Sequence, residues 1–311
     1  MVMKNQTSFT GFILLGLTED EKLKIPLFVL FFVFHIITLL GNIGIMALIS
    51  KSPCLHTPMY FFLSILSFVD LCYSTIIVPN MLVSFLSKLH VITLLGCVTQ
   101  MFFFVAVAAT EGLLLGVMAY DRYNAICNPL HYAVIMTRKV CISLVAAACT
   151  VGTVNSLVNT SLIFRLKFCS DNVISHFYCD IPPLLKIACS DTTLNEVVLF
   201  TVAGCVEVGS LLTVLISYAY IILAIIKIQS SAGKRKAFST CASHFVCVTM
   251  LYVPVLFMYF RPSSVYARDQ DKVASVFYSV ITPMLNPIIY SLRNKDVKRA
   301  LSMLVQKRSL V

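Results

Sequence analysis

Met118-Ala-Tyr-Asp-Arg-Tyr-Asn-Ala-Ile-Cys-Asn-Pro-Leu-His-Tyr132 is the stretch that decides how this chain folds, because it places an acid and a base side by side where a long apolar segment ends. The pair Asp121-Arg122 would be costly inside a bilayer, so we expect it at the cytoplasmic edge of a membrane-spanning helix, where Arg122 can reach neighbouring helices. Pro129 should stop that helix. Taken alone, such a pair also fits an ion pair that only anchors the segment.

The composition places the whole chain in a membrane. Hydrophobic residues make up 59% of its 311 residues and charged residues only 12%, about half the charged fraction of an ordinary soluble domain. Seven stretches reach the length of about 20 mainly apolar residues that a spanning helix needs. They cover residues 25–50, 58–86, 96–120, 140–164, 195–226, 237–260 and 273–292. The sequence therefore predicts an all-α membrane protein, a bundle of seven transmembrane helices.

The charged residues predict the orientation and the chain's organisation. With the N-terminus outside, 14 of the 24 Lys and Arg residues lie on the cytoplasmic side and nine acidic residues lie outside. We expect an extracellular tail over residues 1–24, a seven-helix domain over 25–292 and a cytoplasmic tail over 293–311. Val297, Leu301 and Leu304 recur at helical spacing in the last tail and predict a short amphipathic helix on the inner leaflet. The basic inner surface suits anionic lipid and an acidic-rimmed partner protein, and we expect no nucleic-acid binding.

The extracellular side is expected to carry the covalent modifications. Asn5-Gln6-Thr7 is a glycosylation sequon in the outer tail, so we expect a glycan on Asn5. Of the 12 cysteines, four fall at or beyond the outer edge of the spans, where the compartment is oxidising, and the sequence allows three pairings among them. They are Cys97, Cys169, Cys179 and Cys189. His176 lies near Cys179, but a cysteine in a disulfide offers no thiolate, so we expect no metal there.

Two carboxylates are expected deep in the apolar spans. Asp70 and Glu111 are costly there unless they have partners, and Asn286 is a candidate partner. One interpretation is a buried polar network that locks helix packing. The other is a cation site, because two neighbouring carboxylates without a base would otherwise hold a proton. The two interpretations are compatible.

Five motifs in order resemble the olfactory receptors, a branch of the rhodopsin-like G-protein-coupled receptors. The resemblance spans residues 12–301 and starts from Met118-Ala-Tyr-Asp-Arg-Tyr123 with Pro129-Leu-His-Tyr132. The other motifs are Pro58-Met-Tyr-Phe-Phe-Leu63 with Asp70-Leu-Cys72, the cysteine spacing of the second extracellular loop, Lys236-Ala-Phe-Ser-Thr-Cys-Ala-Ser-His244, and Pro283-Met-Leu-Asn286-Pro287-Ile-Ile-Tyr290. Asn124 and Phe245 depart from the family's usual residues at the coupling end.

The resemblance implies a receptor of the plasma membrane that binds a small odorant within the bundle and activates a heterotrimeric stimulatory G protein to raise cyclic AMP. It implies disulfides Cys97–Cys179 and Cys169–Cys189. It also implies a set of residues that switch the receptor and couple it to the G protein. These are Asp121, Arg122, Tyr123, Tyr218, Lys236, His244, Asn286, Pro287 and Tyr290.

The outer half of the bundle is expected to bind the ligand. Helical spacing and the resemblance together predict the lining residues Phe104, Val105, Ala108, Ala109, Val202, Val206, Tyr252, Val255, Tyr259 and Ser279. Phe104 stands where amine-binding relatives carry an aspartate, so we expect a largely uncharged, apolar ligand with one carbonyl or alcohol group. Glu207 is open to two interpretations: it faces a neighbouring helix, or it faces the cavity and holds a cation or a ligand hydroxyl.

Other functions fit the sequence less well. The six histidines are scattered over both sides and all depths, so we expect neither an enzyme nor a cofactor. A transporter would use intramembrane carboxylates, but it would be expected to show an internal repeat, and none is evident. A receptor for an endogenous small molecule is the alternative within the same class.

Overall fold

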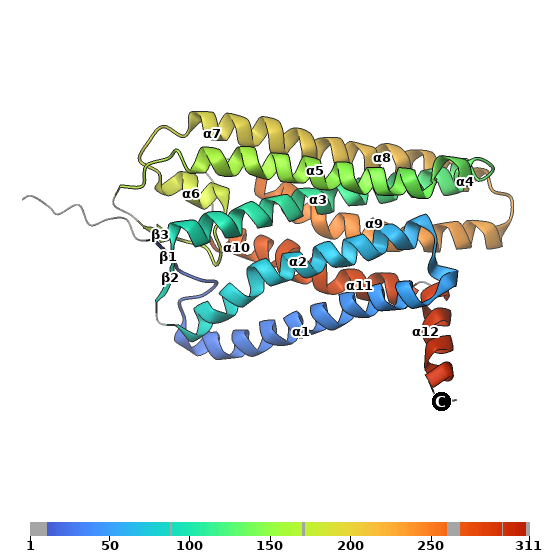
Figure 1. Ribbon diagram of the computed structural model, residues 1–311, viewed down its shortest axis with the longest axis horizontal. Helices are drawn as coiled ribbons and strands as arrows, with labels where there is room; N and C mark the ends of the chain where they lie inside the picture. Colours follow the sequence, from blue (N-terminus) through green and yellow to red (C-terminus); the bar gives the residue numbers. More distant parts are fainter. Residues whose placement is uncertain (1–10, 88, 170–171, 260–267, 294, 309–311) are drawn as a thin grey trace, which may run out of the picture.

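The computed structural model describes residues 11–87, 89–169, 172–259, 268–293 and 295–308. Within these residues, seven helical spans are long and apolar enough to cross a membrane, which confirms the predicted architecture. They form one elongated bundle (Figure 1). The spans are α1 (Glu21–Lys51), α2 (Pro58–Leu86), α3 (Leu94–Cys127), α5 (Arg138–Ile163), α7 to α8 (Thr193–Lys227), α9 (Ser231–Tyr259) and α10 to α11 (268–293).

Local capping sets helix ends that hydropathy placed only roughly. Helix α1 begins at Glu21, before the predicted start, because the Asp20 side chain accepts a hydrogen bond from the Lys22 amide at 2.9 Å. Thr93 caps α3 in the same way, accepting from the Gly96 amide at 3.1 Å. The end of α3 lies at Cys127, two residues before Pro129. The Asp-Arg pair therefore lies inside the helix, more than a turn before its end.

Two of the spans contain a π-helical turn that hydropathy did not predict. In the fifth span, the π-helix η2 (Leu199–Ala203) joins α7 (Thr193–Val198) to α8 (Gly204–Lys227). In the seventh, the π-helix η4 (Phe277–Ile281) joins α10 (Arg268–Val276) to α11 (Thr282–Arg293). Such turns are rare and are frequent at functional sites. Both turns lie in the outer half of the bundle, where the ligand is expected.

Helix α3 lies at the centre of the bundle and approaches its neighbours at small residues (Figure 1). A Cβ on Gly152 of α5 would lie 2.5 Å from the Thr110 hydroxyl oxygen and 2.7 Å from the Ala106 carbonyl oxygen of α3. Since helices in lipid gain no hydrophobic energy by associating, close backbone contact of this kind is a main source of their packing energy.

A small sheet covers the extracellular end. Strand β1 (Phe12–Leu14) pairs antiparallel with β2 (His90–Ile92) and parallel with β3 (Val173–Ile174). The side chain of Phe12 is fully buried and that of Leu14 nearly so. The tail predicted over residues 1–24 therefore contributes a strand to the packed structure. Asn5 lies outside the described residues.

Two disulfides join this cap to the helices, Cys97–Cys179 and Cys169–Cys189, the pairs that the resemblance implied. The first ties the start of α3 to the second extracellular loop. That loop also contains the short helix α6 (Ile181–Ile187), whose N-terminus is capped by the Asp180 side chain.

The cytoplasmic end carries three further helices: η1 (Pro53–Leu55), α4 (Tyr132–Ile135) and α12 (Lys295–Arg308). Figure 1 shows α12 running crosswise to the bundle, as expected of a helix on the inner leaflet. Its Val297 and Ala300 side chains are buried against the bundle, whereas Leu301 is exposed. The face directed to lipid therefore includes Leu301, and Val297 belongs to the core instead.

Candidate functional site

Aromatic rings enclose Phe104 in the outer half of the bundle. Its ring centroid lies 5.4 Å from that of Tyr73 on α2, 4.8 Å from that of Tyr178 in the second extracellular loop and 6.4 Å from that of Tyr278 on η4. All four side chains are buried. Contacts at these distances are favourable for tilted rings. The residue predicted at the ligand wall is thus the centre of an aromatic cluster built from two helices, a loop and a π-turn.

The second extracellular loop forms the roof of this cluster. Every residue of His176-Phe-Tyr-Cys-Asp180 is at most 3% exposed, although loops usually run over the surface. The Cys179 amide donates to the Gln100 side chain at 3.0 Å, which adds to the disulfide with α3. Because of this burial, polar groups in the roof need internal partners.

A series of hydrogen bonds that crosses to the seventh span supplies several of those partners, although His176 Nδ1 has none among the described residues. His176 Nε2 lies 3.1 Å from the Ser275 hydroxyl, which lies 3.2 Å from the Tyr278 hydroxyl. The Tyr278 and Tyr178 hydroxyls are 2.6 Å apart, and Tyr178 donates to Asp180 at 3.3 Å.

Burial sets the charges of the two titratable groups in this hydrogen-bonded series, His176 and Asp180. Burial, helped by the nearby charge of Lys272, lowers the pKa of His176 to about 3, so its ring is neutral. Burial also raises the pKa of Asp180 to about 6, against the opposing effect of its hydrogen bonds from Ile181 and Tyr178. At neutral pH the roof therefore holds one buried carboxylate and no buried imidazolium.

The other predicted lining residues lie in several environments. Ala109 and Tyr252 are buried, as is Ser279, whose hydroxyl has no hydrogen-bond partner in the described part of the chain. Val105, Ala108, Val202, Val206 and Val255 are half-buried. Tyr259 ends α9, and its side chain lies outside what the structure describes.

A polar cluster lies deeper in the bundle, below the aromatic one. Tyr252 donates to the Ser210 hydroxyl at 2.7 Å, and Ser210 in turn donates to the Gly112 carbonyl. The two Glu207 carboxylate oxygens lie 3.1 and 3.6 Å from where a Cβ on Gly112 would stand. Since Gly112 is one turn from Ala108 on the same face of α3, Glu207 points into the bundle toward the predicted ligand wall.

Asp70 and Glu111, the carboxylates predicted to be deep in the bundle, lie in one region. Both oxygens of Asp70 accept from the Asn286 side-chain amide, at 3.2 and 3.1 Å. Glu111 is fully buried and interacts electrostatically with Asp70, yet neither of its oxygens has a hydrogen-bond partner in the described residues. This is the arrangement expected both of a polar packing network and of a cation site. Next to Asn286, the ring of Pro287 packs closely against Gly41 of α1: a Cβ added to Gly41 would lie 3.0 Å from it.

The cytoplasmic half holds the Asp-Arg pair in a buried setting. Arg122 approaches Asp121 to 3.7 Å, which is an ion-pair contact but too long for a hydrogen bond. Asp121 instead accepts a hydrogen bond of 2.8 Å from the Tyr132 hydroxyl, at the start of α4. Tyr123 is half-buried and packs against Tyr220, with 5.7 Å between ring centroids.

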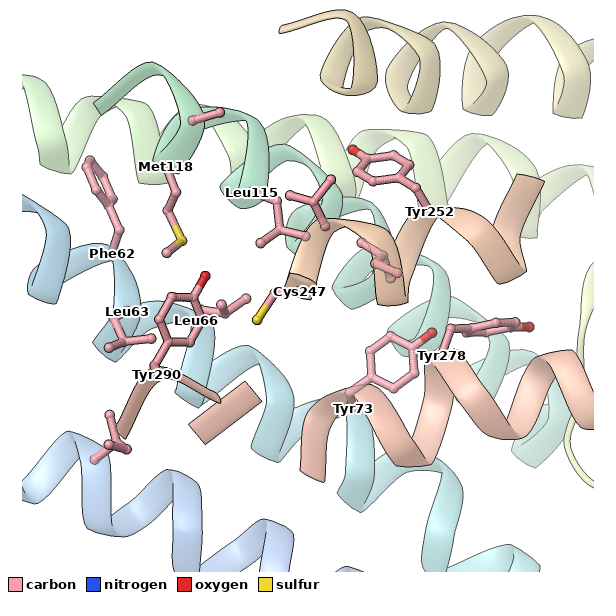
Figure 2. Packing of buried hydrophobic residues seen from close by; sticks show 14 of the residues in the cluster. Phe62, Leu63, Leu66, Tyr73, Leu115, Met118, Cys247, Tyr252, Tyr278 and Tyr290 are labelled. Carbon is pink, nitrogen blue, oxygen red and sulfur yellow. The ribbon is translucent and has the colours of Figure 1, made fainter. Parts of the chain in front are cut away.

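Contacts among α3, α8, α9 and α11 bring most of the other predicted coupling residues together. The Tyr218 hydroxyl lies 2.8 Å from His244 Nδ1, and His244 Nε2 lies 3.1 Å from the Leu115 carbonyl oxygen. His244 thus links α8, α9 and α3. Figure 2 shows Tyr290 of α11 directed toward Cys247 of α9. Lys236 lies in α9, and its side chain is outside what the structure describes.

Sequence reasoning missed several residues that complete these clusters. Tyr178 and Tyr278 read as ordinary apolar residues, and their hydroxyls meet across 100 positions of sequence. Ser210 and Ser275 lie in none of the recognised motifs. Tyr132 was part of a recognised motif, but its contact with Asp121 depends on the turn after Pro129. No short-range pattern encodes contacts of this kind.

The fold and the site together define a seven-helix membrane receptor. The structure is similar to the crystal structure of squid rhodopsin, with a TM-score of 0.69 and 16% identity over 91% of this chain and 81% of that one. At that identity the likeness concerns the fold alone.

Sequence comparisons then identify the family. The olfactory receptor family model matches residues 31–308. The chain is 50% identical to olfactory receptor 5AR1 of Mus musculus (99% of each chain), 51% identical to olfactory receptor 5F1 of Homo sapiens (99% of this chain, 98% of the relative) and 52% identical to olfactory receptor 5I1 of Homo sapiens (96% and 95%). The chain belongs to the olfactory receptor family, a class of multi-pass plasma-membrane receptors that are not enzymes.

Proposed function

We propose that this receptor binds a small, largely apolar odorant in the outer half of the bundle and activates a stimulatory G protein that raises cyclic AMP. The observation that carries the ligand class is the aromatic cluster around Phe104, with rings of Tyr73, Tyr178 and Tyr278 on three sides. Phe104 offers no counter-ion, so a protonated amine seated on it would lose its hydration without compensation. A hydrocarbon body gains about 0.8 kcal/mol for each CH₂ that it buries.

The ligand's oxygen would bind at the polar cluster below. Tyr252 and Ser210 present hydroxyls one turn beneath the half-buried Ala108, and Glu207 points to the same place. A carbonyl or alcohol on an apolar ligand fits this cluster with its hydrocarbon part against Phe104. Glu207 also marks the competing possibility, because a carboxylate there suits a cationic ligand.

Coupling would proceed through the buried ion pair. Arg122 lies at 3.7 Å from Asp121, which Tyr132 holds by a hydrogen bond. We propose that this arrangement holds the resting state and that activation releases Arg122 toward the G protein. The basic cytoplasmic surface, including Lys298 and Arg299 on α12, suits both that partner and anionic lipid. The Asp70 and Glu111 carboxylates would accept a monovalent cation. Supporting this, the Glu111 oxygens have no hydrogen bond of ordinary geometry among the described residues.

The test is a ligand screen in transfected cells with cyclic AMP as the readout. Matched alcohols, ketones and amines of equal chain length are applied to the wild type, Ala108→Leu and Glu207→Gln, each normalised to surface staining. We expect responses to alcohols or ketones, and Ala108→Leu should lose the longer compounds because its side chain fills their space. A preference for amines that disappears in Glu207→Gln would contradict the neutral-ligand proposal. Ligand responses through another second messenger would contradict the coupling proposal.

A further inference from the structure

The seam between the second extracellular loop and the seventh span is a buried polar contact in the outer half of the bundle. One side, His176 and Tyr178, is fixed to α3 through Cys97–Cys179 and the Gln100 hydrogen bond. The other side, Ser275 and Tyr278, belongs to α10 and η4. The two sides meet in the Tyr178–Tyr278 contact of 2.6 Å and the His176–Ser275 contact of 3.1 Å. We call these four residues the loop seam.

The position of the loop seam couples it to the proposed ligand. Tyr178 and Tyr278 are ring neighbours of Phe104, so a molecule seated on Phe104 lies against the residues whose hydroxyls form the seam. Both tyrosines are buried, and a buried hydroxyl that loses its partner costs free energy. Any displacement of Tyr278 by a ligand must therefore break or replace this contact.

The turn that carries Tyr278 is suited to movement. It is the π-helix η4, an interruption of the α-helical bonding pattern of the kind at which helices kink. The same turn carries Ser279, a buried hydroxyl with no partner in the described part of the chain, so moving the Ser279 side chain breaks no hydrogen bond of its own. Below it, α11 is held to α2 by the bonds from Asn286 to Asp70. The seventh span is also bonded to α9 through Thr282 and to α1 through the Pro283 carbonyl, and the loop seam holds its outer part.

We propose that the Tyr178–Tyr278 contact is a latch that stabilises the resting state, and that a ligand on Phe104 activates the receptor by separating the two hydroxyls. The structure shows the latch closed together with the Asp121–Arg122 contact, at opposite ends of the bundle. Tyr278 and Tyr178 are therefore positioning residues for activation. The latch deepens the proposed function and rests on it for its ligand.

The test needs no ligand, because a resting-state latch acts on basal activity. Tyr178→Phe and Tyr278→Phe each remove one hydroxyl and keep the ring. At equal surface amounts we expect each variant to raise basal cyclic AMP, through a shift of about fivefold in the ratio of active to resting receptor, the factor carried by one net hydrogen bond. The double variant should exceed neither single variant by more than about twofold, because the 2.6 Å contact is lost in all three and only the longer bonds, Tyr178 to Asp180 and Tyr278 to Ser275, differ between them. The matched control is Ser190→Ala, which removes a hydrogen bond to Lys167 in the same loop and touches no part of the seam.

Hydrogen exchange of the purified full-length receptor separates failure of the latch from failure of the proposed function. In Tyr278→Phe, exchange should rise both at residues 176–181 and at 275–281. Unchanged exchange on both sides overturns the latch. Faster exchange with wild-type basal activity, in a receptor that otherwise signals, also overturns it, because the contact would then be merely structural. A wild type that never raises cyclic AMP counts against the proposed coupling, and the exchange result alone then decides the latch. Should both tyrosine variants fail to fold, Ser275→Ala, which breaks the parallel contact, is judged by the same two measurements.

Discussion

Acidification should act on the loop seam through two buried groups with opposite effects. In the closed loop the pKa of His176 is about 3, because of burial and the nearby Lys272, and that of Asp180 is about 6, because of burial. When the loop opens, both return toward their ordinary values of 6.5 and 3.8. As pH falls below 6.5, the open loop gains a proton on His176 that the closed loop cannot bind, so closure weakens. As pH falls through 6, the closed loop gains a proton on Asp180, so closure is strengthened.

The magnitudes decide which effect wins. Between pH 7.4 and pH 5.5, His176 should weaken closure by about 1.3 kcal/mol, and Asp180 should strengthen it by about 0.8 kcal/mol. The wild type should therefore lose about 0.5 kcal/mol of closure free energy, roughly a twofold increase in the open population. Asp180→Asn leaves only the histidine effect, about tenfold more opening. His176→Gln leaves only the carboxylate effect, about fourfold less opening, which reverses the sign.

Hydrogen exchange at residues 173–181 measures this directly. The receptor is held in lipid nanodiscs at each pH, and its rates are divided by those of a short peptide of the same sequence, which removes the intrinsic pH dependence of exchange. Buried amides in the middle of α2 serve as an internal reference that should not change. The reasoning would be refuted by an identical pH response in the wild type, Asp180→Asn and His176→Gln. It would also be refuted if lowering the pH changed exchange in the same direction in both variants.

Three further outcomes are expected from the packing, the disulfides and the ion pair. Gly152→Ala should destabilise the receptor by about 1 to 3 kcal/mol, because its Cβ would lie 2.5 Å from the Thr110 hydroxyl oxygen, whereas Gly44→Ala, with nothing within 4 Å, should be neutral in the same thermal unfolding assay. Cys97→Ser and Cys179→Ser should each reduce surface staining as much as the double variant, since they break one bridge with a contribution of about 2 to 4 kcal/mol; additive losses would show that the two cysteines act separately. Arg122→Ala should leave surface amounts within roughly twofold while removing the cyclic AMP response, because two-state coupling of about 1 to 3 kcal/mol is lost; a normal response would remove Arg122 from the mechanism.

The sequence predicts features that depend on local composition or on recognised motifs. Hydropathy located all seven spans, because a bilayer demands about 20 apolar residues wherever a helix crosses it. Charge and Pro129 placed the inner end of α3 to within a few residues. The resemblance supplied the disulfide pairs, which spacing alone left open among three possibilities.

Long-range contacts and short elements could not be predicted in this way. Strand β1 has three residues, too few for a periodic signal, and its partners lie about 80 and 160 positions away. The two π-turns arise inside predicted spans, and no feature of the local composition marks where they begin. Val297 was expected to face lipid, but the crosswise direction of α12 places it against the bundle. The hydroxyls of Tyr178 and Tyr278 find each other only after the loop has been fixed by its disulfide.

Helix α3 explains how a weak ligand could switch such a bundle. Along its length it meets its surroundings through a few isolated polar contacts: Gln100 with the loop, the Gly112 carbonyl with α8, the Leu115 carbonyl with His244 of α9, and Asp121 with Tyr132. The Phe102 carbonyl adds a contact with the Ser156 hydroxyl of α5, and much of the remaining surface of α3 is apolar. Apolar helix faces do not prefer one another to lipid. Each polar contact contributes about 0.6 kcal/mol on average in a membrane protein. The relative positions of the helices therefore rest on several small terms, and a ligand that buries a few methylene groups, at about 0.8 kcal/mol each, supplies enough free energy to exchange one set of contacts for another.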